Sequence, residues 1–144
     1  MSNNGYNPVN WDCDKSGCFN RRCRPKIERL SCALPGRNAF GDVDAINEQN
    51  GYILMLEWKN SGSRELRGGQ DIMYRNITMS GPVTVMVIVG NAETMDVISY
   101  SIFRNGERYP ENHDVLASLD DIRAYIRNWS QEAWRSKPAW DLGR

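Results

Sequence analysis

The sequence predicts an α/β fold, with a central mixed β-sheet flanked by helices on both of its faces. Three observations predict it. Side chains over residues 52–59 alternate between two faces with a period of two, and both faces of the first half are apolar, as in a buried central strand. Residues 83–89 are dense in β-branched side chains, which favour strands. Residues 61–79 lie between these runs with helical spacing, so they can form the crossover between parallel strands.

The N-terminal half predicts a tail, a short helix and a hairpin. Residues 1–10 are polar and lack periodicity, so we expect a flexible tail. A proline at position 25 suits the first turn of a short helix over residues 26–30. Residues 39–47 predict a strand. The Asn50-Gly51 pair after it is typical of a tight hairpin turn, which would pair this strand with the one over residues 52–59.

The C-terminal half predicts two strands and a final helix. A Gly-Pro pair is expected to end the helix over residues 61–79, and strands follow over residues 83–89 and 96–104. Ser118, with an aspartate three residues later, resembles a capping box. We therefore expect the last helix over residues 118–137.

Length and composition favour one folded domain. The 144 residues, of which 40% are hydrophobic and 10% aromatic, exclude a disordered chain for most of the length. We expect a single domain over residues 11–144, with a cysteine-rich segment (11–32), a core (33–104) and the final helix. The longest near-continuous apolar stretch has eight residues, against about 20 for a spanning helix, and no signal-peptide pattern opens the chain. We expect a soluble, cytoplasmic protein that does not bind membranes.

Basic residues are concentrated in one segment. The net charge is zero, yet residues 15–37 contain seven basic side chains and a single acidic one. Such segregation favours an anionic partner, nucleic acid first, although a solvated basic face is the alternative. The candidate nucleic-acid-binding residues are Arg21, Arg22, Arg24, Lys26 and Arg29.

Acidic residues on the predicted hairpin suggest a metal site. Asp42 and Asp44 lie on its first strand, and Glu57 and Lys59 lie on one face near the end of its second. Carboxylates from adjacent strands can hold Mg²⁺, which prefers oxygen ligands. A lysine on the same face can steady an attacking water or the charge that grows on a phosphate. This combination suits phosphodiester hydrolysis.

The pattern resembles the PD-(D/E)XK superfamily of restriction-endonuclease-like nucleases, whose motif is an Asp, a strand hairpin and Glu-x-Lys. The last element stands here as Glu57-Trp58-Lys59. The resemblance implies a restriction-endonuclease-like αβββαβ core and cleavage of DNA or RNA that depends on Mg²⁺ or Mn²⁺. It implies Asp44 and Glu57 as metal ligands, Asp42 as an accessory ligand, and Lys59 as the residue that positions the water.

A second element extends the resemblance to the predicted crossover helix. Gln70-x-x-x-Tyr74 is similar to the Gln-x-x-x-Tyr element of RecB-like nucleases, which implies that both residues orient substrate or the catalytic lysine. Glu28 stands where many members carry an extra acid that assists the metal. The resemblance covers residues 26–89. It departs from the family in lacking a separate strand before Asn38.

The four cysteines suggest a structural zinc site. They are Cys13, Cys18, Cys23 and Cys32. Thiolates this close together fit tetrahedral Zn²⁺, which would stiffen a segment too small for its own core. Plain reduced cysteines, with Cys32 packed in the core, and a disulfide in a secreted protein are the alternatives.

Three further residues are open to functional and structural interpretations. Trp134 and Trp140 could stack on nucleic-acid bases, but we expect them to pack on the core. His113 has no catalytic partner at a suitable spacing, so we expect a surface residue.

The sequence therefore predicts a metal-dependent nuclease, with DNA favoured over RNA as substrate. The resemblance implies a compact nuclease of the kind frequent in bacteriophages, acting in the host cytoplasm. A homodimer would suit cleavage of two strands. The alternative is an inactive, zinc-containing module of the same fold that binds nucleic acid or protein without cutting.

Overall fold

The computed structural model describes residues 26–60, 66, 68–79, 81–110 and 115–143. The chain divides into two compact units, residues 1–42 and 43–144. The division falls inside the segment that we expected to be one core, so Asp42 and Asp44 belong to different units. In the first unit, the bounds of helix α1 (Glu28–Ser31) overlap those of the short helix that the sequence predicts over residues 26–30.

The second unit contains a six-stranded mixed sheet. Strands β1 to β5 lie side by side in chain order, and β6 pairs with β4. Strand β2 runs parallel to β3, while β1 with β2, β3 with β4, and β4 with β5 and β6 are antiparallel. The strand bounds are β1 Ala45–Gln49, β2 Tyr52–Asn60, β3 Val83–Asn91, β4 Asp96–Arg104, β5 Glu107–Tyr109 and β6 Val115–Leu116.

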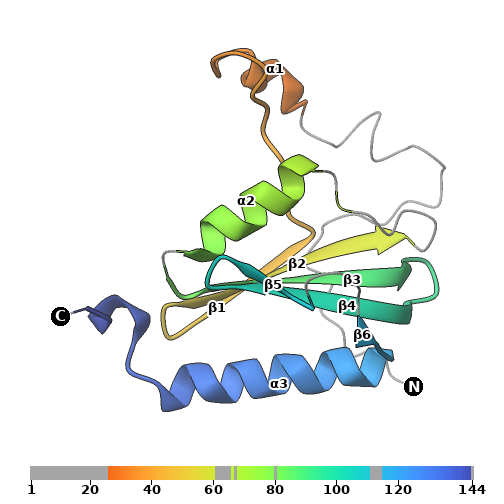
Figure 1. The fold of residues 1–144 in the computed structure, drawn as a ribbon, viewed down its shortest axis with the longest axis vertical. Helices are drawn as coiled ribbons and strands as arrows, with labels where there is room; N and C mark the ends of the chain where they lie inside the picture. The colour runs from red at the N-terminus through yellow and green to blue at the C-terminus, as the bar shows by residue number, and fades with distance from the viewer. Residues whose placement is uncertain (1–25, 61–65, 67, 80, 111–114, 144) are drawn as a thin grey trace. The chain divides into compact units, whose positions relative to one another are not determined.

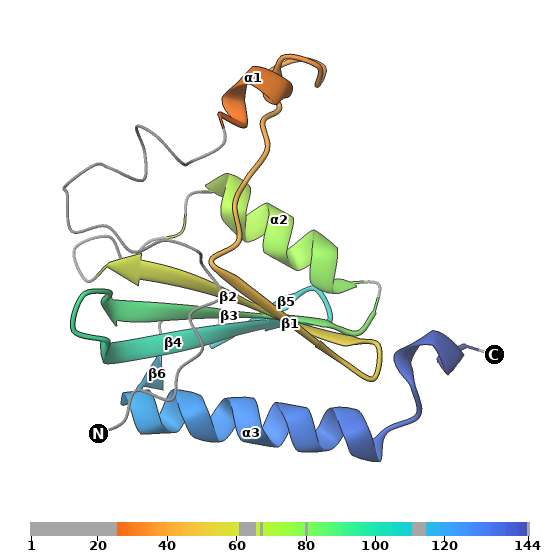
Figure 2. The same cartoon turned by 180° about the vertical axis from the view of Figure 1, so that it is seen from behind.

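The two long helices cover opposite faces of this sheet (Figure 1). Helix α2 (Gly68–Met79) connects β2 to β3 and packs on a buried cluster that includes Val85 and Phe103. Helix α3 (Leu119–Arg135) packs on a second cluster that includes Leu54 and Met86. The view from behind shows the same three layers (Figure 2). The predicted α/β fold with a mixed sheet flanked by helices is confirmed.

The Asn-Gly turn joins β1 and β2 as the sequence predicts. Asn50 and Gly51 have positive φ angles of 56° and 82°, the combination that a two-residue hairpin turn requires. The C-terminal segment, including the 3₁₀ helix η2 (Ala139–Asp141), is bonded to this turn. The Asn50 side chain donates to the Ala133 carbonyl (2.7 Å), and the Ala139 N–H donates to the Asn50 carbonyl (2.9 Å). The turn therefore joins the hairpin to the end of the chain.

Two predicted elements begin later than expected. The strand predicted over residues 39–47 begins only at Ala45, because no partner strand accompanies the preceding residues and the Asp44 side chain ends the β1–β2 ladder, as described below. The helix predicted within residues 61–79, after an initial Ser-Gly-Ser loop, begins at Gly68, and residues 61–65 and 67 lie outside the described part of the chain. A glycine destabilises a helix less in the first turn than in the interior, because the first N–H groups of a helix have no intrahelical acceptor.

None of the helices in the described part of the chain combines the length and the apolar character needed to cross a bilayer.

Gly51→Ala is expected to destabilise the protein more than Gly106→Ala. Both glycines have φ near +80°, so either alanine costs about 1–2 kcal/mol for the left-handed conformation. A Cβ at Gly51 would also lie 2.8 Å from Ala139 Cβ and 2.9 Å from Trp140 Cε3, whereas one at Gly106 meets only Met79, at 3.5 Å. Urea unfolding should show an additional loss of about 1 kcal/mol or more for Gly51→Ala. Equal losses would contradict the packing at the turn.

The cap of α3 should make the stability of the protein depend on pH. The backbone N–H and the hydroxyl of Ser118 both donate to the Asp121 carboxylate, at 2.8 and 3.0 Å, and lower the pKa of Asp121 below its ordinary value of 3.8. A lowered folded pKa contributes stability that is present above the unfolded value and is lost as the pH falls through the folded one. Asp121→Asn should therefore be less stable than the wild type at neutral pH.

Urea unfolding at a series of pH values checks this expectation. The difference between Asp121→Asn and the wild type should shrink below about pH 4 and vanish at lower pH, once the wild-type carboxyl is protonated. A difference that stays constant across this range would show that the charge of Asp121 contributes nothing to the cap.

Candidate active site

Strand β2 places Glu57 and Lys59 on the face of the sheet that α2 covers. Their alternate neighbours Leu56 and Trp58 pack on the α3 side, so the face assignment predicted from the alternation is confirmed. Glu57 is 7% exposed, which is unusual for a carboxylate. A charge this buried requires compensating partners nearby.

Three predicted residues meet at this point. The Lys59 ammonium lies 3.0 Å from Glu57 Oε1 and donates to Gln70 Oε1 at 2.9 Å. The Gln70 amide nitrogen in turn donates to Glu57 Oε1 at 3.2 Å. Gln70 lies in the first turn of α2, so the crossover helix supplies the third corner of a closed triangle. This triangle holds the Lys59 side chain in one place, although the side chain keeps 18% of its surface exposed.

Asp44 lies beside β2, between the positions of Glu57 and Lys59 along that strand. Ala45 is the last residue of β1 that pairs with β2, opposite Leu56, so Asp44 is the first residue beyond the ladder. The Asp44 carboxylate accepts a hydrogen bond from the Trp58 backbone N–H at 2.5 Å. In a continued ladder this N–H would bond to a backbone carbonyl of the partner strand, so the side chain of Asp44 takes the place of that carbonyl.

The two carboxylates each keep an oxygen available. The contacts of Asp44 involve only Oδ2 and those of Glu57 only Oε1, and no described residue donates to Asp44 Oδ1 or Glu57 Oε2. No cluster of three or more His, Cys, Asp or Glu side chains occurs in the described part of the chain. Two carboxylates completed by water and phosphate oxygens are nevertheless an ordinary arrangement for Mg²⁺. The chemistry of these oxygens suits a magnesium or manganese ion, and that ion stays a prediction.

Tyr74 lies in the core rather than in this triangle. The residue is 2% exposed, and its ring makes an edge-to-face contact with Phe103, with centroids 5.4 Å apart. Gln70 and Tyr74 share one face of α2, as their spacing predicts. Gln70 contacts the polar end of β2, whereas Tyr74 packs on the apolar cluster beneath the same helix.

The remaining candidates belong to the N-terminal unit or lie outside the described residues. Asp42, Glu28 and Arg29 are exposed, and Lys26 is half-buried. The exposed Cys32 donates through its thiol to the Arg29 carbonyl at 3.2 Å. Cys13, Cys18, Cys23, Arg21, Arg22, Arg24 and His113 lie outside the described residues, so the zinc site stays a prediction.

The two C-terminal tryptophans do not pack in the core as expected. Trp134 is 66% exposed and Trp140 is 61% exposed. The Trp134 indole N–H donates to Gln49 Oε1 at 3.0 Å. Their positions follow from the docking of the C-terminal segment on the hairpin turn, which no local pattern of the sequence shows.

No motif in the sequence indicates the backbone N–H of Trp58 as a partner of Asp44. The length of the hairpin turn nevertheless indicates which aspartate lies near this part of β2. A two-residue turn at Asn50 and Gly51 pairs Ala45 with Leu56, so Asp44 rather than Asp42 is the next residue and lies beside this end of β2.

Comparison with known proteins gives no match to this chain among family models, curated proteins or solved structures.

Asp44 should have a structural role that is separable from its charge. Asp44→Ala leaves the Trp58 N–H without its acceptor, and we expect a loss of about 0.5–1.5 kcal/mol in the free energy of unfolding. Asp44→Asn keeps an oxygen that can accept the bond and should stay near the wild-type value. Urea unfolding measures both. Asp42→Ala is the matched control and should change little, because Asp42 is exposed. Equal stability of Asp44→Ala and the wild type would contradict the role of the bond.

Proposed function

We propose that this chain is a metal-dependent nuclease that hydrolyses phosphodiester bonds, with DNA as the favoured substrate. One observation carries the proposal: Glu57, Lys59 and Gln70 lie within hydrogen-bonding distance of one another, and Asp44 accepts from the backbone N–H of Trp58, the residue between Glu57 and Lys59. The resemblance to PD-(D/E)XK nucleases rests on the same four side chains. The meeting of Glu57 and Lys59 from β2 with Gln70 from the crossover helix supports it.

Each residue has a defined role in the proposed hydrolysis. Asp44 and Glu57 would hold Mg²⁺ or Mn²⁺, which supplies Lewis-acid activation of a phosphate oxygen and of water. The Lys59 ammonium would orient the attacking water and stabilise the charge that grows on the phosphate. Gln70 would keep Lys59 in position by accepting from its ammonium. The attack forms one P–O bond and breaks another, and the leaving oxygen takes up a proton.

The order of elements agrees with this proposal over most of the core. A helix precedes the Asp-bearing hairpin, and a crossover helix then leads to a parallel strand, as in the αβββαβ pattern. Residues 26–44 contain a short helix and no strand, so the described part of the chain lacks the first strand of that pattern.

Lys59→Ala should lower the rate of DNA cleavage by about a hundredfold or more, because it removes the ammonium that would stabilise the charge growing on the phosphate. Asp44→Asn should do the same by removing a charged ligand while keeping the bond to Trp58. The measurement is cleavage of circular and linear DNA with Mg²⁺ or Mn²⁺, and chelator should abolish it. Lys137→Ala, which changes an exposed lysine two residues after the end of α3, is the control and should retain the wild-type rate.

Two results would count against the nuclease. Cleavage that persists in folded Lys59→Ala would remove Lys59 from the mechanism. DNA binding without cleavage, for every metal and every form of DNA, would favour the inactive binding module instead.

A further inference from the structure

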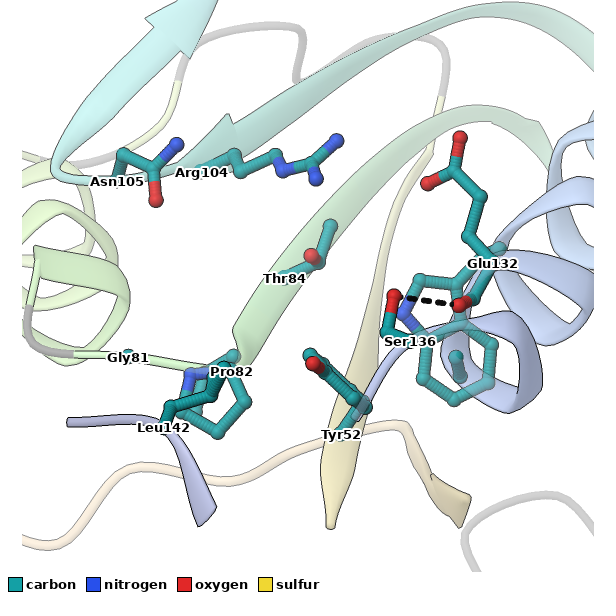
Figure 3. A pocket seen from close by; sticks show the side chains of 12 residues that line it. Tyr52, Gly81, Pro82, Thr84, Arg104, Asn105, Glu132, Ser136 and Leu142 are labelled. Atoms are coloured by element: carbon teal, nitrogen blue, oxygen red, sulfur yellow. Dashed lines mark hydrogen bonds between the residues drawn. The ribbon is translucent and has the colours of Figure 1, made fainter. Parts of the chain in front are cut away.

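A second pocket lies on the other face of the sheet from the candidate active site. It has a volume of about 280 Å³. Its walls come from the start of β3, the β4–β5 turn, the last turns of α3, Tyr52 and the C-terminal segment (Figure 3). Thr84 pairs with Leu54, which packs against α3, so the pocket opens on the α3 side. A ligand here would therefore be separated from Glu57 and Lys59 by the sheet.

Four polar side chains line the pocket, one of them buried (Thr84) and three exposed (Arg104, Asn105 and Glu132). Among the described residues, none makes a hydrogen bond or an ion pair with the side chains of Thr84, Arg104, Asn105 or Glu132. Figure 3 shows the Arg104 guanidinium and the Glu132 carboxylate extending toward each other across the pocket, with Thr84 below the guanidinium in this view. The pocket thus offers cationic donors on one side and anionic acceptors on the other.

Thr84 is the most informative of these side chains. It is only 6% exposed, and buried hydroxyls are normally hydrogen-bonded. Its oxygen is not among the fully enclosed polar atoms that lack a partner, so the hydroxyl opens into the pocket. A buried hydroxyl that faces a pocket without a partner is positioned to bond a ligand.

Apolar groups form the rest of the pocket. Trp129 is 8% exposed, and Tyr52, Pro82 and Leu142 line the side away from the charged groups. The volume lies just below the range of about 300–1,000 Å³ typical of small-molecule sites. A flat, compact ligand with polar edges and apolar faces would fit better than an extended one.

We propose that this pocket binds a guanine base. Guanine presents two acceptors, O6 and N7, on one edge, and arginine binds this pair with its two-pronged donor group. Its neighbouring edge presents the donors N1–H and N2–H₂, and a carboxylate such as that of Glu132 can accept a hydrogen bond from each. Asn105 and Thr84 can add bonds to the same edges, and the apolar walls cover the faces of the ring. The pocket is too small for a whole nucleotide, so the sugar and phosphate stay outside.

A zwitterionic amino acid is the nearest competitor. Its carboxylate would suit Arg104, but its ammonium is a single point of charge rather than a two-pronged edge, so it matches the Glu132 carboxylate less well. Guanine can come from a free nucleotide or from an unpaired position in a strand, and the experiment separates these sources.

Isothermal titration calorimetry without divalent metal tests the proposal apart from any cleavage. Guanosine and guanosine monophosphate should bind with similar affinity, and adenosine at least about tenfold more weakly. An oligothymidylate with one guanine should bind if the strand is the source. If only the free nucleoside binds, the source is a free nucleotide.

Variants identify the pocket as the place of binding. Arg104→Lys keeps the charge but loses the two-pronged donor, and Glu132→Gln replaces one acceptor by a donor. Each should weaken guanosine binding by about tenfold to a hundredfold. Thr84→Val removes the hydroxyl at similar size and should weaken binding less. Asp141→Asn, an exposed carboxylate that does not line the pocket, is the control.

Three results would overturn the proposal. They are no heat of binding with millimolar guanosine, equal binding of adenosine, and guanosine binding that folded Arg104→Lys and Glu132→Gln leave unchanged. Binding of leucine in place of guanosine would assign the pocket to the amino acid. The titration contains no divalent metal, so its result does not depend on whether the protein cleaves DNA. Failure of the proposed nuclease activity and failure of guanine binding are therefore distinguishable.

Discussion

The two-residue turn at Asn50 and Gly51 is the constraint on which most of this structure depends. Its positive φ angles close the hairpin without an extra residue, and this sets the register of β1 against β2. The register in turn ends with Ala45 opposite Leu56, and Asp44, the next residue, bonds to the Trp58 N–H. The same turn holds the C-terminal segment through bonds at Asn50, and Gly51 leaves room for Ala139. One local conformation therefore positions a candidate metal ligand and the end of the chain.

Burial of β2 on both faces explains why the two candidate sites are separate. Side chains alternate along the strand, so Glu57 and Lys59 meet α2 while Leu54 and Leu56 meet α3. On the α2 side, Gln70 compensates the buried charges of the pair. On the α3 side, the end of the sheet leaves Thr84 and Arg104 beside the last turns of α3. A central strand with two covered faces can thus serve two sites that do not share residues.

Much of the fold could be predicted, because its signals are local. Alternation identified the faces of β2, β-branched residues identified β3, and the Asn-Gly pair identified the turn. The start of β1 was predicted too early, since residues 39–44 have no partner strand. The positions of Trp134 and Trp140 were not predictable, because the docking of the chain end on the hairpin determines them. In the candidate site, the pairing of Glu57 with Lys59 followed from their spacing, whereas the contacts with Gln70 required the placement of α2.

By itself, the sequence determined the order of the longer elements, the turn and the residues that share a face, because these follow from backbone geometry over a few neighbouring positions. Only the tertiary structure decided that the short strands β5 and β6 join the sheet, that Tyr74 enters the core, and that Arg104 and Glu132 face one pocket. These outcomes depend on how separate elements pack together, and no short-range pattern along the chain encodes the distance between side chains from different layers.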